Sequence, residues 1–323
     1  MKILFLTSTR IGDAVLSTGL LSHLVACYPS AEITVACGPL PAPIFNGVPG
    51  VTRIIPIKKM PFYLHWLPLW HKSILTFWDI VVDLRASALA WILFTRDRKI
   101  FKSSKSSKNI HRVVELTKFF GLEKPLAPRL WLTEKQLEKA KELVPWGEPV
   151  IGLGVTANWL PKIWPPGNFI ELVHRLTKEN GLFPNARVAV FSGPKERSLA
   201  EPVLKGLPPK NYIDLAGKHT LEVAAACLSK CELFIGNDSG IMHIAAALGT
   251  PTIGLFGPSP AKRYGPWGDH CSVAESKNGY EELVSAPSFD HTKNTNLMHG
   301  LSVEIVEREL DLLWQKMSYQ SDG

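Results

Sequence analysis

The sequence has few cysteines and no long apolar run. Five cysteines are scattered along its 323 residues, and Cys227 and Cys231 have no second pair of ligands nearby, which argues against a zinc site. We expect all five to be buried thiols in a reducing cytosol. No apolar stretch reaches the roughly 20 residues that a membrane span needs. The amino-terminal stretch "MKILFLTSTRIGD" lacks the small-residue cleavage site of a signal peptide.

Three motifs of nucleotide and metal enzymes are absent as well. The chain contains no GxGxxG, no P-loop motif GxxxxGK followed by Ser or Thr, and no HExxH. The stretch "GLGVTAN" comes nearest to a dinucleotide fingerprint, but it has only Gly152 and Gly154. Nicotinamide chemistry, P-loop hydrolysis and zinc hydrolysis are therefore disfavoured.

Positive charge, in contrast, is in excess. The 36 Lys and Arg residues outnumber the 29 Asp and Glu residues and give a net charge of +7. This favours an anionic partner: nucleic acid, an acidic membrane surface, or a phosphorylated or carboxylated substrate. A non-catalytic nucleic-acid binder is the less favoured alternative, because the basic residues lack interleaved aromatics and form no known nucleic-acid module.

Short apolar runs that end in turn residues alternate with segments of helical spacing. The predicted strands are residues 2–8, 32–38, 51–57, 77–84, 150–155, 186–193, 212–217, 231–237 and 250–257. The predicted helices are residues 13–29, 167–180, 196–207, 220–230, 241–249 and 302–317, with one more starting at Ala86. Such alternation predicts an α/β fold with two Rossmann-like, doubly wound parallel-sheet domains that face one another across a cleft.

The domain boundary is expected in "VPWGEP", where proline and glycine interrupt the pattern. The first domain would span residues 1–147 and the second residues 148–323. The closing helix, residues 302–317, is a candidate to pack back on the first domain.

Polar residues gather directly after three predicted strands, and the most informative corner is "GNDSGIMH". The backbone amides of Ser239 and Gly240 would lie at a helix amino terminus, where unpaired N–H groups and the helix dipole attract a phosphate. His243, one turn later, could donate to a phosphate oxygen. The alternative is a simply capped helix, with Asp238 or Ser239 as the N-cap and His243 as a surface histidine.

The corner after the first strand, "TSTRIGDAVLS", contains Arg10, Gly12 and Asp13. Asp13 is either the N-cap of a helix that begins at Ala14 or a general base toward a substrate hydroxyl. One carboxylate is enough for a direct displacement with inversion, whereas a retaining reaction would want a second one.

Two further loops add charged candidates. Lys162, in the proline-rich loop "NWLPKIWPPGNF", is either a solvated lysine or a charge that neutralises a diphosphate leaving group. Glu196, in "FSGPKE", is either a first-turn glutamate favoured by the helix dipole or an acceptor for ribose hydroxyls.

Two segments of the first domain leave alternatives open. The basic run 96–112 is either a solvated loop or a clamp for an anionic substrate or an acidic membrane surface. The run 61–78, with Trp66, Trp70 and Trp78, could lie at a bilayer interface, although a core helix is favoured.

Taken together, the corners resemble glycosyltransferase family 9, the heptosyltransferases of lipopolysaccharide inner-core assembly. The resemblance covers nearly the whole chain and is carried by "RIGDAVLSTGLL", "DIVVDLRAS", "LPKIWPPGNF", "FSGPKE" and "GNDSGIMHIAAALGTPTIGLFGPS". It implies the GT-B fold, with ADP-heptose as the donor in the second domain. The acceptor, Kdo-lipid A or a heptosylated core, would bind the first domain. A transferase or epimerase that uses a UDP- or GDP-linked sugar is the alternative.

The resemblance also implies roles for single residues. Asp13 matches the family's proposed base, Lys162 the lysine on the donor phosphates and Glu196 the ribose-binding acid. The remaining donor-binding candidates are Asp238, Ser239, Gly240, His243 and, as a looser match to the adenine pocket, His219. The acceptor-binding candidates are Arg10, Gly12, Arg85, Arg96, Arg98 and Lys99.

The implied enzyme needs no metal or cofactor, binds no nucleic acid and is cytoplasmic, peripherally associated with the inner membrane. Two departures from the family pattern stand out: Ser239 replaces a frequent threonine but keeps the hydroxyl, and residues 286–304 lack the usual cysteine-bearing run. The second departure affects the expected conformation of the final loop and leaves the expected chemistry unchanged.

Overall fold

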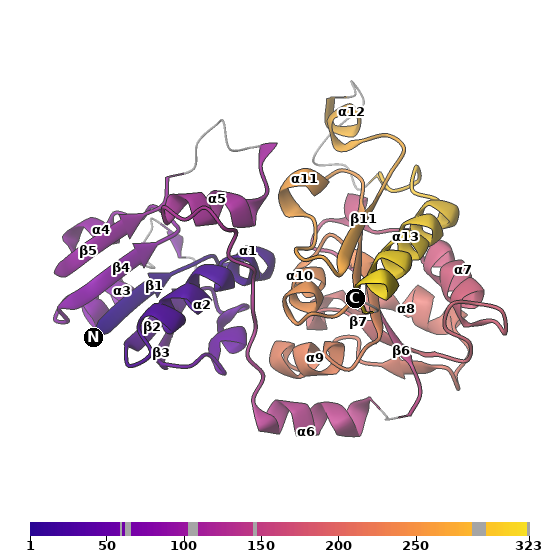
Figure 1. Ribbon diagram of the computed structural model, residues 1–323, viewed down its shortest axis with the longest axis horizontal. Helices are drawn as coiled ribbons and strands as arrows, with labels where there is room; N and C mark the ends of the chain where they lie inside the picture. The colour runs from indigo at the N-terminus through magenta and orange to yellow at the C-terminus, as the bar shows by residue number, and fades with distance from the viewer. Residues whose placement is uncertain (59, 62–65, 103–108, 145–146, 286–294, 322–323) are drawn as a thin grey trace. The chain divides into compact units, whose positions relative to one another are not determined.

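The computed structural model describes residues 1–58, 60–61, 66–102, 109–144, 147–285 and 295–321 (Figure 1). The chain divides into two compact units, Met1–Thr133 and Glu134–Gly323. Each unit contains a parallel sheet with helices packed on it. Within the described ranges, no helix is both long and apolar enough to cross a membrane.

The first unit contains a five-stranded parallel sheet in the order β3-β2-β1-β4-β5. The strands are β1 (Lys2–Leu6), β2 (Glu32–Cys37), β3 (Val51–Pro56), β4 (Trp78–Asp83) and β5 (Thr95–Ile100). β1 pairs with β2 on one side and β4 on the other, so the chain reverses its direction of travel across the sheet between β1 and β4. This reversal is where open parallel sheets bind ligands, at the carboxyl ends of the strands.

The helices of the first unit are short. They are α1 (Ile11–Leu16), α2 (Thr18–Cys27), α3 (Trp66–Ser73), α4 (Leu89–Ile92) and α5 (Arg112–Phe119), with the 3₁₀ turn η1 (Ala42–Phe45). Leu69 of α3 and Leu89 of α4 belong to one buried cluster with Leu4 and Val81 of the sheet. Helices α3 and α4 therefore cover the same face of this sheet.

The second unit contains a six-stranded parallel sheet in the order β11-β10-β9-β6-β7-β8. The strands are β6 (Val150–Gly154), β7 (Arg187–Phe191), β8 (Tyr212–Asp214), β9 (Leu233–Asn237), β10 (Thr252–Phe256) and β11 (Cys271–Glu275). β6, β9 and β10 are buried along their whole length. That burial explains why they read in the sequence as continuous apolar runs.

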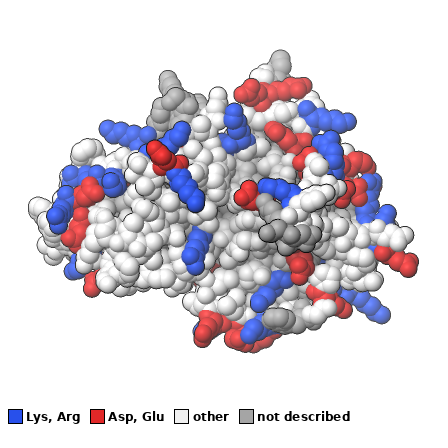
Figure 2. All heavy atoms as spheres, in the orientation of Figure 1, with Lys and Arg blue, Asp and Glu red and all other residues white. Residues whose placement is uncertain are grey.

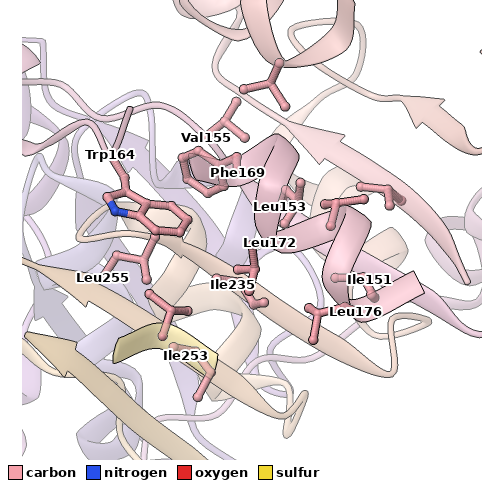
Figure 3. Close-up of a cluster of buried hydrophobic side chains, with 14 of the residues drawn as sticks. Ile151, Leu153, Val155, Trp164, Phe169, Leu172, Leu176, Ile235, Ile253 and Leu255 are labelled. Carbon is pink, nitrogen blue, oxygen red and sulfur yellow. The ribbon is translucent and has the colours of Figure 1, made fainter. Parts of the chain in front are cut away.

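Three helices of the second unit share one hydrophobic core, drawn in Figure 3. They are α7 (Pro166–Thr177), α8 (Arg197–Gly206) and α13 (Val303–Ser321). Trp164, just before α7, lies edge-on to Phe169 in this core, with ring centroids 4.9 Å apart. The other helices are α6 (Glu134–Leu143), α9 (Leu221–Leu228), α10 (Gly240–Ala247), α11 (Ala261–Tyr264) and α12 (Tyr280–Ser285), with the 3₁₀ turns η4 (Leu160–Lys162) and η5 (Pro194–Glu196).

The division between the units differs from the expected boundary at residues 147 and 148. Helix α6, which the sequence analysis assigned to the first domain, packs against α9 and so belongs to the second unit. Within the second unit, the closing helix α13 packs against β11, α7 and β10.

Three local predictions were wrong. The helix expected over residues 13–29 is two helices that meet at Ser17, whose hydroxyl contacts Thr7 Oγ1 and donates to Ala14 O. The helix expected from Ala86 is only the single turn α4, followed by strand β5. Cys27 is exposed, whereas Cys37, Cys227 and Cys231 are buried as expected and Cys271 is half-buried.

Candidate active site

The second sheet reverses its order between β6 and β9, and the loops that follow these strands carry most of the predicted donor residues. β6 is followed by Lys162, β7 by Glu196, and β9 by Asp238 and Ser239. The carboxyl ends of neighbouring parallel strands lie at one edge of the sheet, so these loops share that edge.

Lys162 and Asp238 form an ion pair between two of these loops. The Nζ atom of Lys162 lies 2.5 Å from Oδ2 of Asp238, and the side chains are 20% and 10% exposed. The interpretation of Lys162 as a solvated loop residue is therefore wrong. Asp238 directly precedes Ser239, the N-cap residue of α10, so the ion pair places the Lys162 ammonium group near the start of this helix.

Helix α10 begins without a side-chain cap. Ser239 occupies the N-cap position in an extended conformation, as the capped-helix alternative expects, but its side chain makes no capping hydrogen bond. The Ser239 Oγ atom is buried and, among the described residues, has no hydrogen-bond partner. The first amides of a helix have no intrahelical acceptor. This corner therefore presents N–H groups and a hydroxyl, a set that suits an anion.

Two facing glycines make room for the Phe234 ring, and one of them also adjoins α10. Gly154 of β6 is in register with Gly236 of β9. A Cβ atom on Gly154 would lie 2.6 Å from the Phe234 ring and 3.2 Å from Ile241 of α10. In the sequence Gly154 stands out only as part of an incomplete dinucleotide motif, whereas in the fold it leaves room for the Phe234 ring and the first turn of α10.

Glu196 connects the loop after β7 with the loop after β6. Its Oε2 atom accepts a hydrogen bond from Thr156 Oγ1 at 2.7 Å and a longer one from the Gly193 amide at 3.4 Å. Glu196 is also the N-cap residue of α8, which agrees with the alternative interpretation of a glutamate at a helix start. Thr156 was not predicted from the sequence, because it has no special neighbours in its own segment.

A segment distant in the sequence fixes the Lys162 loop. The Asn296 Nδ2 atom donates to Ile163 O at 2.7 Å, and the Leu297 amide donates to Pro161 O at 3.1 Å. These two carbonyl groups flank Lys162 on either side. Residues 295–301 therefore hold the backbone of the Lys162 loop in place. Residues 286–294, the first part of the segment that departs from the family pattern, lie outside the described residues.

Trp164 completes this support. Its amide donates to Oδ1 of Asn237 at 2.9 Å, and its indole Nε1 donates to Leu301 O at 2.7 Å. Asn237 is fully buried and directly precedes Asp238. The Lys162 loop and the Asp238 corner are thus joined by the ion pair and by this backbone contact.

The two histidines have different surroundings. His243 is buried within α10, so the surface-histidine interpretation is wrong. His219 lies just before the start of α9, where burial and then the positive charges of Lys139 and Lys218 lower its pKa. It therefore favours the neutral form in this environment.

In the first unit, Asp13 lies in the first turn of α1. The helix begins at Ile11 with Arg10 as its N-cap residue, so the prediction that Asp13 caps a helix starting at Ala14 was wrong. Ser8 Oγ donates to Asp13 Oδ2 at 3.5 Å, a long and therefore weak bond. The Asp13 carboxylate is half-buried, next to the half-buried Gly12, and Arg10 is exposed.

The loop that carries Arg85 is shaped by a buried acid. Asp83, at the end of β4, accepts hydrogen bonds from the Arg85 amide and from the amide and hydroxyl of Ser87, at 2.6–2.7 Å. The Arg85 guanidinium stacks over Trp66 at 4.7 Å. Burial lowers the Arg85 pKa, and the charge of Asp83 opposes this shift. Asp83 was not singled out from the sequence, because its partners became apparent only in the folded turn.

The basic run begins as a strand rather than a loop, so that prediction was wrong for residues 96–100. Arg98 donates to Leu93 O at 2.9 Å, and Lys99 pairs with Asp97 at 3.7 Å. Arg96 is exposed. Lys105 and Lys108 of this run lie outside the described residues.

The described part of the chain contains no group of three or more His, Cys, Asp or Glu side chains placed to hold a metal ion. The expectation that the protein needs no metal stays a prediction.

Comparisons with known proteins agree with this architecture. The chain is 25% identical over 326 residues to lipooligosaccharide heptosyltransferase 2 of Haemophilus influenzae, covering 90% of this chain and 92% of that protein. A glycosyl transferase family 9 structure from Veillonella parvula superposes with a TM-score of 0.78 at 21% identity, covering 97% and 96% of the two chains.

The structure of E. coli ADP-heptose lipopolysaccharide heptosyltransferase II superposes with a TM-score of 0.73 at 22% identity, covering 98% and 100% of the two chains. The predicted GT-B fold class, with two Rossmann-like parallel-sheet domains, is therefore confirmed. The pattern of the family described as glycosyltransferase family 9 (heptosyltransferase) matches residues 83–293. The chain thus belongs to glycosyltransferase family 9, and the protein is a glycosyltransferase.

Proposed function

We propose that this glycosyltransferase moves a heptose from ADP-heptose to the lipopolysaccharide inner core, with inversion at the anomeric carbon. The observation that carries the proposal is the Lys162–Asp238 pair beside the uncapped start of α10. A diphosphate needs positive charge and N–H donors, and this corner supplies both. The names of the similar proteins from Haemophilus influenzae and E. coli support heptose as the sugar and ADP as its carrier.

The donor would be held by the second unit. Lys162 and the first amides of α10 would bind the diphosphate, with the Ser239 hydroxyl as a further donor. Glu196, already oriented by Thr156, would accept from the ribose hydroxyls. His243, buried in α10, and His219, just before α9, would be the remaining donor-site residues.

The acceptor would be Kdo-lipid A or a heptosylated core, held by basic groups of the first unit that include Arg10 and Arg85. Asp13 would act as the general base. As the acceptor oxygen forms its bond to the anomeric carbon, the bond from that carbon to the diphosphate breaks. The acceptor proton passes to Asp13, and the negative charge that leaves with ADP is stabilised by Lys162 and the α10 amides.

A thermal-shift panel tests the donor, because a ligand that binds only the folded state raises the melting temperature. ADP should raise it, while UDP, GDP, NAD and an oligonucleotide should have little effect. Selective stabilisation by UDP or GDP would assign another donor, and stabilisation by the oligonucleotide alone would favour a nucleic-acid binder. Incubation with ADP-heptose and Kdo-lipid A should then yield a product heavier by one heptose in mass spectrometry.

A further inference from the structure

Large apolar side chains lie on the solvent side of the first unit, around α3 and α4. Leu69 of α3 is buried in the sheet-facing cluster, yet Trp70 next to it is exposed. In the same way, Leu89 of α4 is buried, whereas Trp91 is 59% exposed. The outer side of a surface helix is normally polar, yet both helices also expose large apolar side chains there, in α3 next to the exposed His71 and Lys72.

The loops beside the two helices extend this surface. Leu75, Phe77 and Phe94 are 96%, 63% and 65% exposed. The amide of Trp78 donates to Phe94 O at 2.9 Å, which brings Phe77 and Phe94 together at the start of neighbouring strands. The core interpretation of the aromatic run 61–78 therefore holds for the buried Trp78 but is wrong for Trp70.

We call this set the α3–α4 apolar patch. Its members are Trp70, Leu75, Phe77, Trp91, Ile92 and Phe94. Since α3 and α4 pack on one face of the sheet through a shared cluster, their outer sides are exposed on the same side of this unit. Soluble proteins rarely expose contiguous apolar surface of this kind unless it meets a partner.

The positive charge of the protein is concentrated in the same part of the chain. Residues 53–102 contain nine Lys and Arg residues and three Asp residues, which accounts for +6 of the net +7. Arg98 stacks over Trp91 of the patch at 5.7 Å, and Arg96 is exposed on the same edge strand. Figure 2 shows Lys and Arg side chains, interrupted by acidic ones, over the end of this unit where Figure 1 labels α4 and β5.

We propose that the α3–α4 apolar patch and its basic border dock the protein on an anionic lipid bilayer. Tryptophan and phenylalanine side chains partition into the interface between head groups and acyl chains. Lys and Arg residues around them are attracted to anionic head groups. The described helices include none that could span a bilayer, so docking by a surface patch fits the structure.

Flotation of the full chain with lipid vesicles tests this proposal without sugar donor or acceptor, so its result does not depend on the proposed transfer reaction. The protein should float with phosphatidylcholine vesicles that contain phosphatidylglycerol and much less with phosphatidylcholine alone. Phe77→Ser with Phe94→Ser should abolish flotation. Arg96→Gln should weaken binding about fivefold, and salt should weaken it further.

A matched control changes two exposed apolar residues of α13, with Leu312→Ser and Tyr319→Ser. This variant should float like the wild type, and circular dichroism should show that all variants are folded. Equal flotation of the Phe77 and Phe94 variant and the wild type would overturn the proposal. A wild-type protein that fails to float would also overturn it. The same holds if the wild type binds no vesicles but forms a concentration-dependent dimer that the Phe77 and Phe94 variant does not form.

Discussion

The Lys162 ammonium lies 2.5 Å from the Asp238 carboxylate although 76 residues separate them in the chain. Asp238 precedes the N-cap of α10, so the lysine is held at the helix start while its charge is balanced. A diphosphate at this position would give Lys162 a second anionic partner. The Lys162 side chain would then balance the charge of Asp238 before the donor binds and stabilise the negative charge of ADP as it leaves.

This relationship predicts that Lys162→Met lowers kcat/KM for transfer about 100- to 1,000-fold, the usual loss when one preorganised donor to a developing charge is removed. Steady-state kinetics would measure the effect. Lys178→Met, at an exposed lysine just after α7, should leave kcat/KM unchanged. A Lys162→Met enzyme with kcat/KM close to that of the wild type would remove Lys162 from the proposed role.

Asp13→Asn should separate donor binding from transfer. Loss of a general base lowers kcat about 100- to 10,000-fold. ADP should still raise the melting temperature of this variant, because the proposed donor residues belong to the second unit. Glu32→Gln, at an exposed carboxylate of the first unit, serves as the control. Retained turnover in Asp13→Asn would disprove the base assignment, and a lost ADP shift would implicate Asp13 in donor binding.

The sequence predicted every central strand but only two of the four edge strands, β3 and β8. β1, β6 and β9 are buried, so each reads as a short apolar run. β5 and β11 were missed, and both lie at the edge of their sheets. The sequence of β5, "TRDRKI", has almost no apolar residues, and none of its residues is fully buried. Its strand conformation comes from pairing with β4, which no local pattern reveals.

The site residues divide in a similar way. Lys162, Glu196 and Asp238 could be predicted because each follows a recognisable strand in a polar loop. The contacts of Asn296 and Thr156 could not be predicted, because they depend on segments 133 and 40 residues away. Helix α6 was missed because "EKQLEKAKEL" is mostly charged, and only Gln136 and Ala140 are buried.

Asn296 offers a test of how firmly the Lys162 loop must be held. Its Nδ2 atom bonds to Ile163 O and its Oδ1 atom accepts from the Met298 amide. Asn296→Asp keeps the acceptor but loses the donor, so it should shift the lysine loop while residues 296–298 keep their turn. A displacement of about 1 Å can cost up to 100-fold in rate. We expect kcat to fall while the KM for the acceptor stays nearly constant.

The control for this variant is Asn278→Ala, which removes an exposed hydrogen bond to Glu282. It should leave kcat unchanged. An Asn296→Asp enzyme that loses thermal stability but keeps the wild-type kcat would show that Asn296 supports the fold only.

Gly154 and Gly236 predict a packing defect. In Gly154→Ala the new methyl group would lie 2.6 Å from the buried Phe234 ring, so the variant should lose about 1–3 kcal/mol of unfolding free energy. Urea unfolding would measure the loss. Gly167→Ala is a matched change in the first turn of α7 with no atom within 4 Å, and it should stabilise the protein by about 0.5–1 kcal/mol. Equal stability of the two variants would contradict the close packing of the Phe234 ring on Gly154.

Asp214 predicts a pH dependence of stability. It accepts hydrogen bonds from Arg197 at 2.8 and 3.0 Å and forms an ion pair with Lys218 at 2.7 Å. Burial alone would raise its pKa, but these two cations outweigh burial and lower the pKa from 3.8 to about 2. Because the folded state favours the carboxylate, its contribution is fully present above about pH 4 and is lost as the pH falls toward 2.

Asp214→Asn removes this charge. The difference in unfolding free energy between wild type and Asp214→Asn should therefore be constant from pH 7 to 5 and shrink between pH 4 and 2. Urea titrations at a series of pH values would measure it. Glu201, which pairs with Lys205 on the exposed side of α8, gives the control Glu201→Gln. A difference for Asp214→Asn that stays constant down to pH 2 would mean that the carboxylate is not held by Arg197 and Lys218 in solution.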